Sequence, residues 1–338
     1  MPSSEQVNKQ LPLLLCPYCQ SPLLPDAKTW LCDGSLNAKG TRHPFDVARQ
    51  GYVNLLPVQH KKSKEPGDSQ QSIDARHRFL SQGFYLPLQQ QIVQLIKCYL
   101  DDTTTSDSSI YQTWLDIGCG EGYYTQAMAK ALQAPSILNT HILIAIDISK
   151  PAVVQLAKMA KNKQALWHQI ENKRQNALSL LDNGVLISFM QAMPAIYPVI
   201  ASAAHLPLAD HSVDGICTIF SPILPEEFAR VLKSGGRLLI AKPDTGHLQS
   251  MREALFDEVR PHDSDKFLDE LAPYFELKNT HQVQCELSLN ADSLADLLTM
   301  TPYSYRAKAE KREALLASTE QEEFKTEARF VVYELVAL

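Results

Sequence analysis

The stretch that decides the fold is Trp114-Leu115-Asp116-Ile117-Gly118-Cys119-Gly120-Glu121-Gly122. An apolar segment over residues 113–117 runs into three glycines at alternate positions, and residues 123–132 then follow a helical pattern. Glycine lets the backbone turn tightly and approach a ligand closely, because it carries no Cβ atom. The stretch therefore predicts a strand, a glycine-rich ligand loop and a helix, with Asp116 at the end of the strand.

The glycine spacing distinguishes this loop from two common phosphate-binding loops. It follows the pattern Gly-x-Gly-x-Gly, whereas the dinucleotide fingerprint is Gly-x-Gly-x-x-Gly and a triphosphate loop ends in Lys-Ser/Thr. A carboxylate at Asp116 can hold a cationic group. S-adenosylmethionine (SAM) has a sulfonium and a charged amino-acid end, which need acids rather than a phosphate cradle. The loop therefore predicts SAM binding, with Asp116 and Gly118 in the site.

Strands and helices alternate further along the chain. A second apolar strand, 142–146, ends in Asp147, and an acid at this place typically binds the ribose hydroxyls of a nucleotide. Residues 212–216 open a fourth strand, and residues 230–238 end a helix and start a fifth strand. This order predicts an α/β fold with a mostly parallel sheet covered on both faces. It resembles the Rossmann-like class I SAM-dependent methyltransferase fold; a Rossmann-like domain with another ligand, or with none, is the alternative.

Length and composition limit the class of protein. The 338 residues suffice for two domains, and a hydrophobic content of 45% suffices for a packed core. No apolar run approaches the ~20 residues that cross a membrane, and the polar start, residues 1–10, lacks the apolar core of a signal peptide. We therefore expect a cytoplasmic protein with no membrane partner. Seven cysteines, an odd number in such a chain, do not predict a disulfide framework.

Charge is distributed unevenly along the chain. A net charge of −6 argues against nucleic-acid binding by the protein as a whole. Basic residues nevertheless outnumber acidic residues between Arg42 and Phe84, a segment that contains His60-Lys61-Lys62. This segment could dock on a phosphate backbone, and a solvated loop without a partner is the equally supported alternative.

Cysteines near the amino terminus predict a metal site. Cys16 and Cys19 form a Cys-x-x-Cys pair, which directs two thiolates to one centre, and Cys32 follows. Because tetrahedral zinc needs four ligands and His43 is the next strong donor, we predict a closed structural zinc site of these four residues. A redox role for the pair is the alternative, although no thioredoxin-like helix follows. The other cysteines are expected to be small buried residues: Cys98, Cys119, Cys217 and Cys285.

These patterns divide the chain into three parts. Residues 1–60 are expected to form the zinc-binding domain, residues 61–112 a linker with helices, and residues 113–338 the methyltransferase domain. Within the linker, residues 75–80 and 85–100 have the periodicity of helices.

Three separated groups of motifs resemble one known family. They are Cys-Pro-x-Cys with Arg-His-x-Phe-Asp; Gly-Tyr-Val-Asn-Leu-Leu-Pro-Val-Gln-His-Lys with Pro-Gly-Asp-Ser; and Leu-Asp-Ile-Gly-Cys-Gly-Glu-Gly-Tyr-Tyr-Thr with the late Met-Thr-Pro. The pattern covers nearly the whole chain and resembles the RlmA (RrmA) family of 23S rRNA guanine-N1 methyltransferases. The resemblance implies a zinc-binding domain joined to a SAM fold, methylation of one guanine in a hairpin of domain II of 23S rRNA, and a homodimer.

The resemblance also implies residues of the cofactor site. Tyr85, in Gly-Phe-Tyr-Leu-Pro-Leu, should contact SAM, and Gly120 and Glu121 should line its methionine and ribose side. His247 matches a further SAM-contacting histidine, and a histidine that starts a helix and faces solvent is the alternative.

The chain departs from the family pattern in three places. Cys32 and His43 are farther apart than in the family, and residues 162–195 form an insertion. Ser202 stands where many related methyltransferases carry an acid before Leu-Pro. The adenine amino group would then be read by the backbone or by the Ser202 hydroxyl.

Chemistry at guanine N1 requires removal of its proton, so a base or a group that stabilises O6 is wanted. Asp116, His205 and His247 are candidates, and the sequence does not name the base. The target base must be unpaired or flipped out. Candidates to stack on it, with ordinary packing as the alternative, are Tyr303, Tyr305 and Arg306. A small-molecule methyltransferase acting on a quinone or lipid precursor, and a non-catalytic SAM-binding ribosome assembly factor, are the competing functions.

Overall fold

The computed structural model describes residues 13–61, 63–103, 112–133, 141–161, 195–259, 267–320 and 322–338. The predicted insertion, 162–195, lies outside these residues except for Ala195, where a strand begins. No helix among the described residues is long and apolar enough to cross a membrane.

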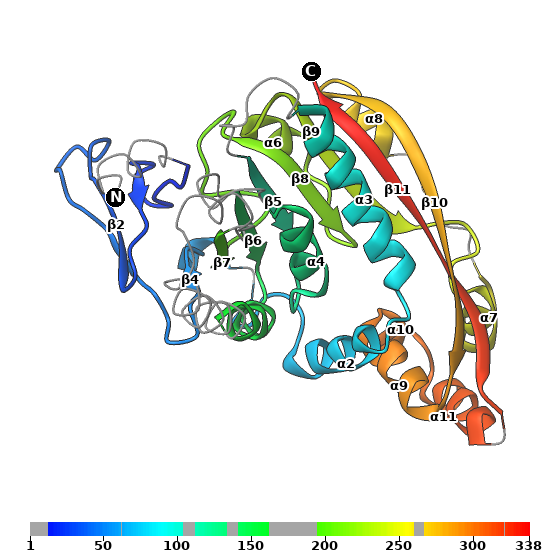
Figure 1. The fold of residues 1–338 in the computed structure, drawn as a ribbon. Coiled ribbons are helices and arrows are strands. Elements are labelled where there is room, and N and C mark those ends of the chain that lie inside the picture. Colours follow the sequence, from blue (N-terminus) through cyan, green and yellow to red (C-terminus); the bar gives the residue numbers. More distant parts are fainter. Residues whose placement is uncertain are drawn as a thin grey trace, which may run out of the picture.

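A sheet of eight strands forms the centre of the molecule (Figure 1), in the order β10-β11-β9-β8-β5-β6-β7-β4. The six strands from β9 to β4 run parallel to one another, and β11 is antiparallel to both β9 and β10. This mostly parallel sheet confirms the predicted α/β fold. The bounds are β4 Val53–Asn54, β5 Thr113–Ile117, β6 Ile142–Asp147, β7 Ala195–Ile200, β8 Val213–Ile219, β9 Leu232–Pro243, β10 Phe275–Leu289 and β11 Phe324–Ala337.

Both faces of the sheet are covered, which explains why every residue of β5 is buried. Successive side chains of a strand point to opposite faces. Trp114 therefore packs in the cluster formed with α3 and α4, whereas Leu115 packs in the cluster formed with α6 and the amino-terminal residues. The helices include α2 Gln70–Ser81, α3 Leu86–Thr103, α4 Tyr123–Ala131, α6 Pro225–Val231, α7 Gln249–Leu255, α8 Phe267–Leu271, α9 Ala291–Met300, α10 Tyr303–Arg306 and α11 Ala309–Ala317, with short 3₁₀ helices at Val58–His60 and Ser318–Glu320. Residues 150–161, after β6, are also helical.

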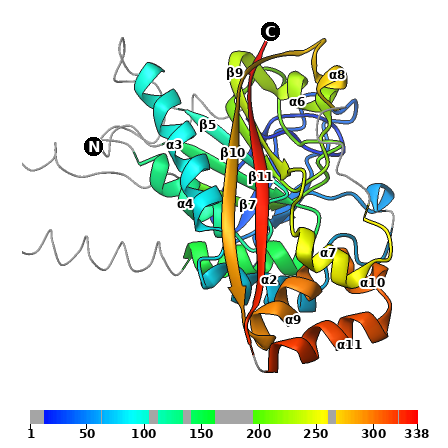
Figure 2. The same ribbon diagram turned by 90° about the vertical axis from the view of Figure 1, so that its right-hand side faces the viewer.

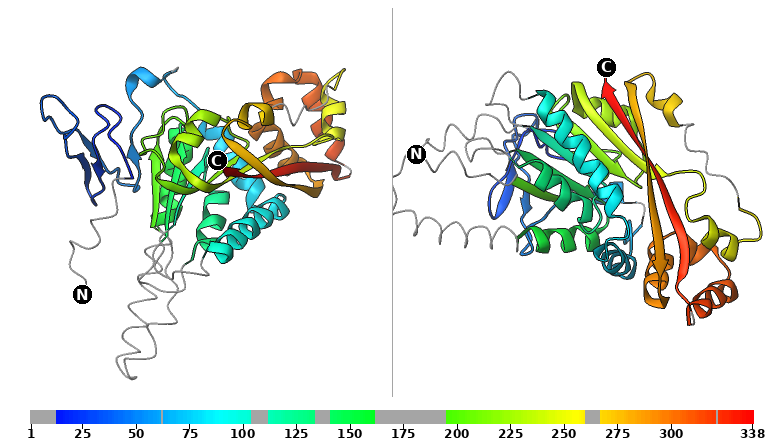
Figure 3. Two further views of the ribbon diagram at one scale, coloured as in Figure 1. Left: turned by 90° about the horizontal axis from the view of Figure 1, so that it is seen from above. Right: turned by 45° about the vertical axis from the view of Figure 1, so that its right-hand side comes forward.

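Residues 13–61, which we call the N-terminal module, contain a second sheet of three strands: β1 (Leu23–Leu24), β2 (Thr29–Cys32) and β3 (Pro44–Asp46). The module pairs with the large sheet and with the connection between β7 and β8. β4 pairs in parallel with β7, and Leu14 forms an antiparallel bridge with Leu208. Figure 3 shows the module at one end of the large sheet and the β10–β11 hairpin at the other. The module therefore shares its apolar core with the sheet instead of standing apart.

The β10–β11 hairpin extends beyond the rest of the sheet (Figure 2). β11 pairs with β10 from Phe324 to Ala337, but it pairs with β9 only from Phe330 onward. The overhanging part lies at the carboxyl edge of the parallel strands, where α2, α7, α9, α10 and α11 gather around it. We call α7 and α9–α11 the cap. The edge that binds ligands in open α/β sheets is therefore covered by helices.

Candidate zinc centre and cofactor cradle

The four predicted metal ligands converge in the N-terminal module. Their donor atoms all lie within 4.8 Å of one another. Sγ of Cys19 lies 3.8 Å from Sγ of Cys32, and Nδ1 of His43 lies 3.5 Å from Sγ of Cys16. Ligands at the usual zinc distances occupy corners of a tetrahedron about 3.6–3.8 Å apart. The spacing of these side chains therefore fits one Zn²⁺ ion.

A hairpin explains why the long Cys32–His43 spacing does not disturb this geometry. β2 and β3 pair antiparallel, with Leu31 opposite Pro44. His43 N donates a hydrogen bond to Sγ of Cys32 at 3.0 Å, and Cys32 N donates to the carbonyl of His43 at 3.2 Å. Because the strands fix the two ligands, the length of the connection between them does not affect the site.

The predicted glycine loop joins β5 to α4 at the carboxyl edge. Gly118, Gly120 and Gly122 have φ values of +71°, +55° and +94°, in the left-handed region that favours glycine. A Cβ atom at Gly118 would collide with Ser221, which follows β8. The loop thus lies where the chain turns to opposite sides of β5, the position at which such sheets bind nucleotides.

Three acidic residues surround the glycine loop. Asp147 ends β6, and its two carboxylate oxygens accept hydrogen bonds from Gly120 N at 2.9 Å and Ser149 N at 2.8 Å. Asp116 is 2% exposed and accepts a hydrogen bond from Oγ1 of Thr125 at 2.5 Å. Glu121 is also 2% exposed, and its Oε1 has no hydrogen-bond partner among the described residues.

The electrostatics of these acids fit a cationic ligand. Burial raises the pKa of Asp116 to about 7, against the opposing effect of its hydrogen bond from Thr125. Burial also raises the pKa values of Glu121 and Asp147. A buried carboxylate is stabilised by a nearby positive charge. The sulfonium and ammonium groups of SAM supply such charges, so the cradle fits this cofactor.

Sequence reasoning missed two residues of the cradle, Asp68 and Arg76. Ser149 donates its hydroxyl to the carbonyl of Asp68 at 2.8 Å, so the chain before α2 lies over the end of β6. Arg76, on α2, donates to the carboxylate of Asp68 at 2.5 Å. Its Nη1 lies 3.5 Å from the place that a Cβ atom at Gly120 would occupy. The sequence signal for Asp68 was the Pro-Gly-Asp-Ser motif, which supported the family resemblance but was not connected with the cofactor site.

Tyr85 and His247 meet at one ring of the extended hairpin. Their ring centroids lie 4.8 and 4.9 Å from that of Phe330. Phe220, directly before Ser221, lies 5.3 Å from the same ring. His247 is 6% exposed, so it does not face solvent, and its Nδ1 lies 2.8 Å from the carbonyl oxygen of Arg329. The rings of Phe330 and Phe220 thus connect Tyr85 and His247 to the end of β8, next to the glycine loop.

Ser202 and His205 lie on the side of the sheet that faces the N-terminal module. They line a cavity of about 310 Å³ together with His60 and residues of the module. The His205 ring centroid is 4.5 Å from that of His60. The Ser202 hydroxyl accepts a hydrogen bond from Ala204 N at 3.2 Å, within its own turn.

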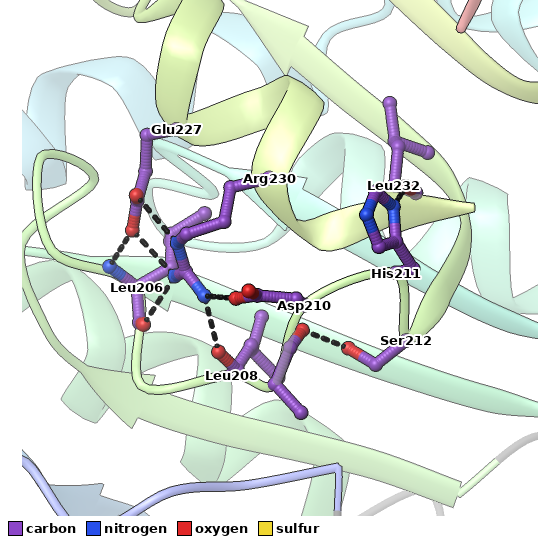
Figure 4. Close-up of polar contacts among 9 residues, drawn as sticks. Leu206, Leu208, Asp210, His211, Ser212, Glu227, Arg230 and Leu232 are labelled. Atoms are coloured by element: carbon purple, nitrogen blue, oxygen red, sulfur yellow. Dashed lines mark hydrogen bonds and ion pairs between the residues drawn. The ribbon is translucent and has the colours of Figure 1, made fainter. Parts of the chain in front are cut away.

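Arg230 holds the loop that follows Ser202 (Figure 4). It donates to the carbonyl oxygens of Leu206 at 3.0 Å and Leu208 at 2.7 Å. Glu227 accepts from Arg230 and from Leu206 N, the latter at 2.6 Å. This network fixes the wall of the cavity between sheet and module.

The three residues expected near the base pocket lie on α10, in the cap. Tyr303 packs inside the cap, with its ring 5.8 Å from that of Phe256. Tyr305 is 74% exposed, and the Arg306 guanidinium lies 5.9 Å from its ring centroid.

A groove of about 750 Å³ lies between α2, α3 and α4. It includes Tyr123, which comes one residue after the glycine loop, and the basic side chains Lys97 and Lys130. No carboxylate is among the described residues that line it. Its charge therefore suits an anionic ligand.

Comparisons with known proteins agree with the assignment of the zinc centre and with that of the cofactor cradle. Residues 14–64 match the family model of the RlmA N-terminal domain, and residues 111–278 match a methyltransferase-domain model. Together with the fold and the Cys₃His cluster, these matches make the protein a SAM-dependent methyltransferase whose cofactors are SAM and Zn²⁺.

Relatives with curated names are similar over most of the chain. A 23S rRNA (guanine(748)-N(1))-methyltransferase from Streptomyces fradiae is 28% identical over 86% of this chain and 85% of its own. A relative from Micromonospora griseorubida, provisionally named a 23S rRNA (guanine-N(1)-)-methyltransferase, is 26% identical over 91% of this chain and 92% of its own. Among solved structures, YcgJ from Bacillus subtilis is 15% identical, with a TM-score of 0.42 over 71% of this chain and 97% of its own.

Proposed function

Because the chain belongs to the RlmA family, we propose that it transfers a methyl group from SAM to N1 of one guanine in a domain II hairpin of 23S rRNA. The observation that carries the proposal is that one molecule contains both a zinc centre and a cofactor cradle. A zinc module of the RlmA type is built into the edge of the sheet whose carboxyl end holds the cofactor cradle.

The chain offers groups for each task of this reaction. Asp116, Glu121 and Asp147 would hold SAM, which supplies an electrophilic methyl group when bound. Methyl transfer is an in-line displacement, so positioning contributes much of the rate. The N-terminal module, which includes His60 and Lys61, would hold the RNA so that the guanine reaches the cradle. The groove between α2, α3 and α4, with Lys97 and Lys130, supports a path for phosphates beside it.

The base candidate His247 lies in the aromatic group around Phe330, with its Nδ1 2.8 Å from the carbonyl oxygen of Arg329. Asp116 is engaged by Thr125 inside the cradle, and His205 lies against His60. Proton removal from guanine N1 is therefore assigned to His247 in this proposal.

The test is methyl transfer from SAM labelled in its methyl group to 23S rRNA that lacks modifications. Nucleoside analysis of the digested RNA should yield labelled 1-methylguanosine. Label in a small metabolite and none in RNA would favour a quinone- or lipid-precursor methyltransferase. SAM binding without transfer to either would favour a non-catalytic assembly factor.

We also propose that the protein acts in the cytoplasm and that it forms a homodimer, the latter as the family resemblance implies. The chain has a mass of 37.8 kDa, so light scattering of the purified zinc-loaded protein should give twice that mass. A single-chain mass at working concentration would contradict the dimer and leave the methyltransferase assignment standing.

A further inference from the structure

Arg76 is a partly buried cation in a cradle otherwise lined by acids. Its side chain is 24% exposed, and it comes from α2, outside the glycine loop and both acidic strand ends. Burial acts to lower its pKa, but Asp68, Glu121 and Asp147 outweigh this effect and raise it. The guanidinium therefore stays charged in the cradle.

The methionine end of SAM is a zwitterion whose ammonium and carboxylate groups share one carbon atom. A site for it needs an anion and a cation next to each other. Glu121 is buried, its Oε1 has no hydrogen-bond partner within the described part of the chain, and the Arg76 guanidinium acts on it electrostatically. Arg76 also lies beside Gly120, over the loop that approaches the ligand. Glu121 and Arg76 thus supply the two receptors that a zwitterion requires.

A role in structure alone does not account for this placement. Asp68, the hydrogen-bond partner of Arg76, has a side chain that is 47% exposed. An ion pair of that kind contributes little to stability. Guanidinium has five N–H donors in a fork that matches a carboxylate, so Arg76 can hold Asp68 and a second carboxylate together.

We propose that Arg76 binds the α-carboxylate of SAM and that Asp68 positions its guanidinium over the glycine loop. This inference rests on the assigned cofactor and deepens the proposed function by naming the group that reads the amino-acid end of the methyl donor. Glu121 binds the adjacent ammonium group.

The experiment compares two ligands by calorimetry with the zinc-loaded full chain and no RNA. Decarboxylated SAM keeps the adenosine, sulfonium and amine of SAM but lacks the carboxylate. The wild-type protein should bind SAM at least about tenfold more tightly than decarboxylated SAM, since a hydrogen bond between charged groups is lost. Arg76→Met should bring this ratio close to one, because its affinity for SAM falls and its affinity for decarboxylated SAM does not.

Arg78→Met is the matched control. Arg78 is also on α2 and also pairs with an acid, Asp296, but its side chain is 60% exposed and that partner lies on α9. This variant should keep the wild-type ratio. Arg76→Lys keeps the charge without the fork, so it should give an intermediate ratio and serves if Arg76→Met does not fold.

A wild-type ratio near one, or an undiminished ratio in the folded Arg76 variants, would overturn the inference. Because no RNA is present, either result is independent of whether 23S rRNA is the substrate. Conversely, a protein that forms no 1-methylguanosine could still show the expected ratios.

Discussion

The zinc centre draws all its ligands from residues 16–43, whereas the cofactor cradle combines side chains from α2, β5, β6 and the glycine loop. In the first region a hairpin fixes the ligand distances locally. In the second, the order of strands in the sheet brings distant segments together. The two regions nevertheless share one apolar core, because β4 of the module extends the large sheet. We therefore expect substitutions to separate the functions of the two regions, whereas the shared core should make the two regions unfold together.

The largest expected effect is loss of zinc. Cys32→Ser should abolish stoichiometric zinc binding, because a closed structural site has no spare ligand. The thermal transition should fall markedly and methylation of 23S rRNA should be lost, since metal binding contributes directly to folding. SAM affinity of the remaining folded protein should change by less than about threefold, because no residue of the cradle lies in the module. Metal analysis, thermal unfolding and calorimetry measure the three quantities.

Cys98→Ser is the control for this substitution. Cys98 lies on α3 and is exposed, so the expectation that it is buried is wrong. Among the described residues it belongs to no cluster of metal-ligating side chains. It should leave zinc content and activity unchanged. Equal loss of zinc binding and SAM binding in Cys32→Ser would contradict the separation of the zinc centre from the cofactor cradle.

The next effect is a collision in the glycine loop. Gly118→Ala combines a left-handed φ of +71° with a clash against Ser221, so the loop must move. We expect SAM affinity to fall by about tenfold or more. Gly235→Ala has a similar φ of +77° but open space around its Cβ position. It should reduce stability by about 1 kcal/mol and leave SAM affinity unchanged, and equal losses of SAM affinity in both variants would refute the steric explanation.

A smaller effect is the pH dependence of SAM binding. Burial raises the pKa of Asp116 to about 7, so in the ligand-free protein this group is mostly protonated below that pH. The positive charges of SAM favour the carboxylate, and binding then releases a proton. SAM affinity should therefore rise with pH, by at most about tenfold per unit for this group, and level off above pH 7. Glu121 and Asp147, whose pKa values burial also raises, act in the same direction.

Calorimetry in buffers of different ionisation enthalpy detects the released proton. Asp116→Asn should bind SAM more weakly and show a flatter profile. A wild-type affinity that is constant between about pH 6 and pH 8 would remove the assigned electrostatic role of Asp116.

The smallest expected effect concerns the contact between module and sheet. The rings of Trp30 and Tyr197 pack edge to face, with centroids 5.8 Å apart. A double-mutant cycle of Trp30→Leu and Tyr197→Leu should give a coupling energy of about 0.5–1.5 kcal/mol in chemical unfolding. No coupling, with separate unfolding transitions for the two regions, would show that the shared core does not join them energetically.

Much of the fold could be predicted because its signals are local. The glycine loop, the acid that ends β6 and the Cys-x-x-Cys pair are short patterns with a direct physical meaning. The strand over 113–117 and the helices in the linker are confirmed by β5, α2 and α3. The fourth metal ligand candidate, His43, also lies in the cluster, since the β2–β3 pairing makes its sequence spacing irrelevant.

The remaining features depend on packing between distant segments. No periodicity in the sequence indicates that α2 directs Arg76 toward Gly120. The sequence analysis also considered only the positive charges of SAM, and it therefore predicted acidic residues alone. The pairing of two-residue β4 with β7 likewise has too short a pattern to be recognised. His205 was grouped with the cradle as a base candidate, but it lies against His60 because the loop after β7 turns toward the module.

The most direct test of the central proposal is the position of the methyl group in RNA. A methyl group on N1 blocks the Watson–Crick edge of guanine, so reverse transcription stops there. Full-length 23S rRNA without modifications, incubated with the zinc-loaded protein and SAM, should give one new stop, next to a guanine in a domain II hairpin. A reaction that transfers the label from SAM but leaves every Watson–Crick edge readable, or a stop at a base other than guanine, would contradict the proposed function.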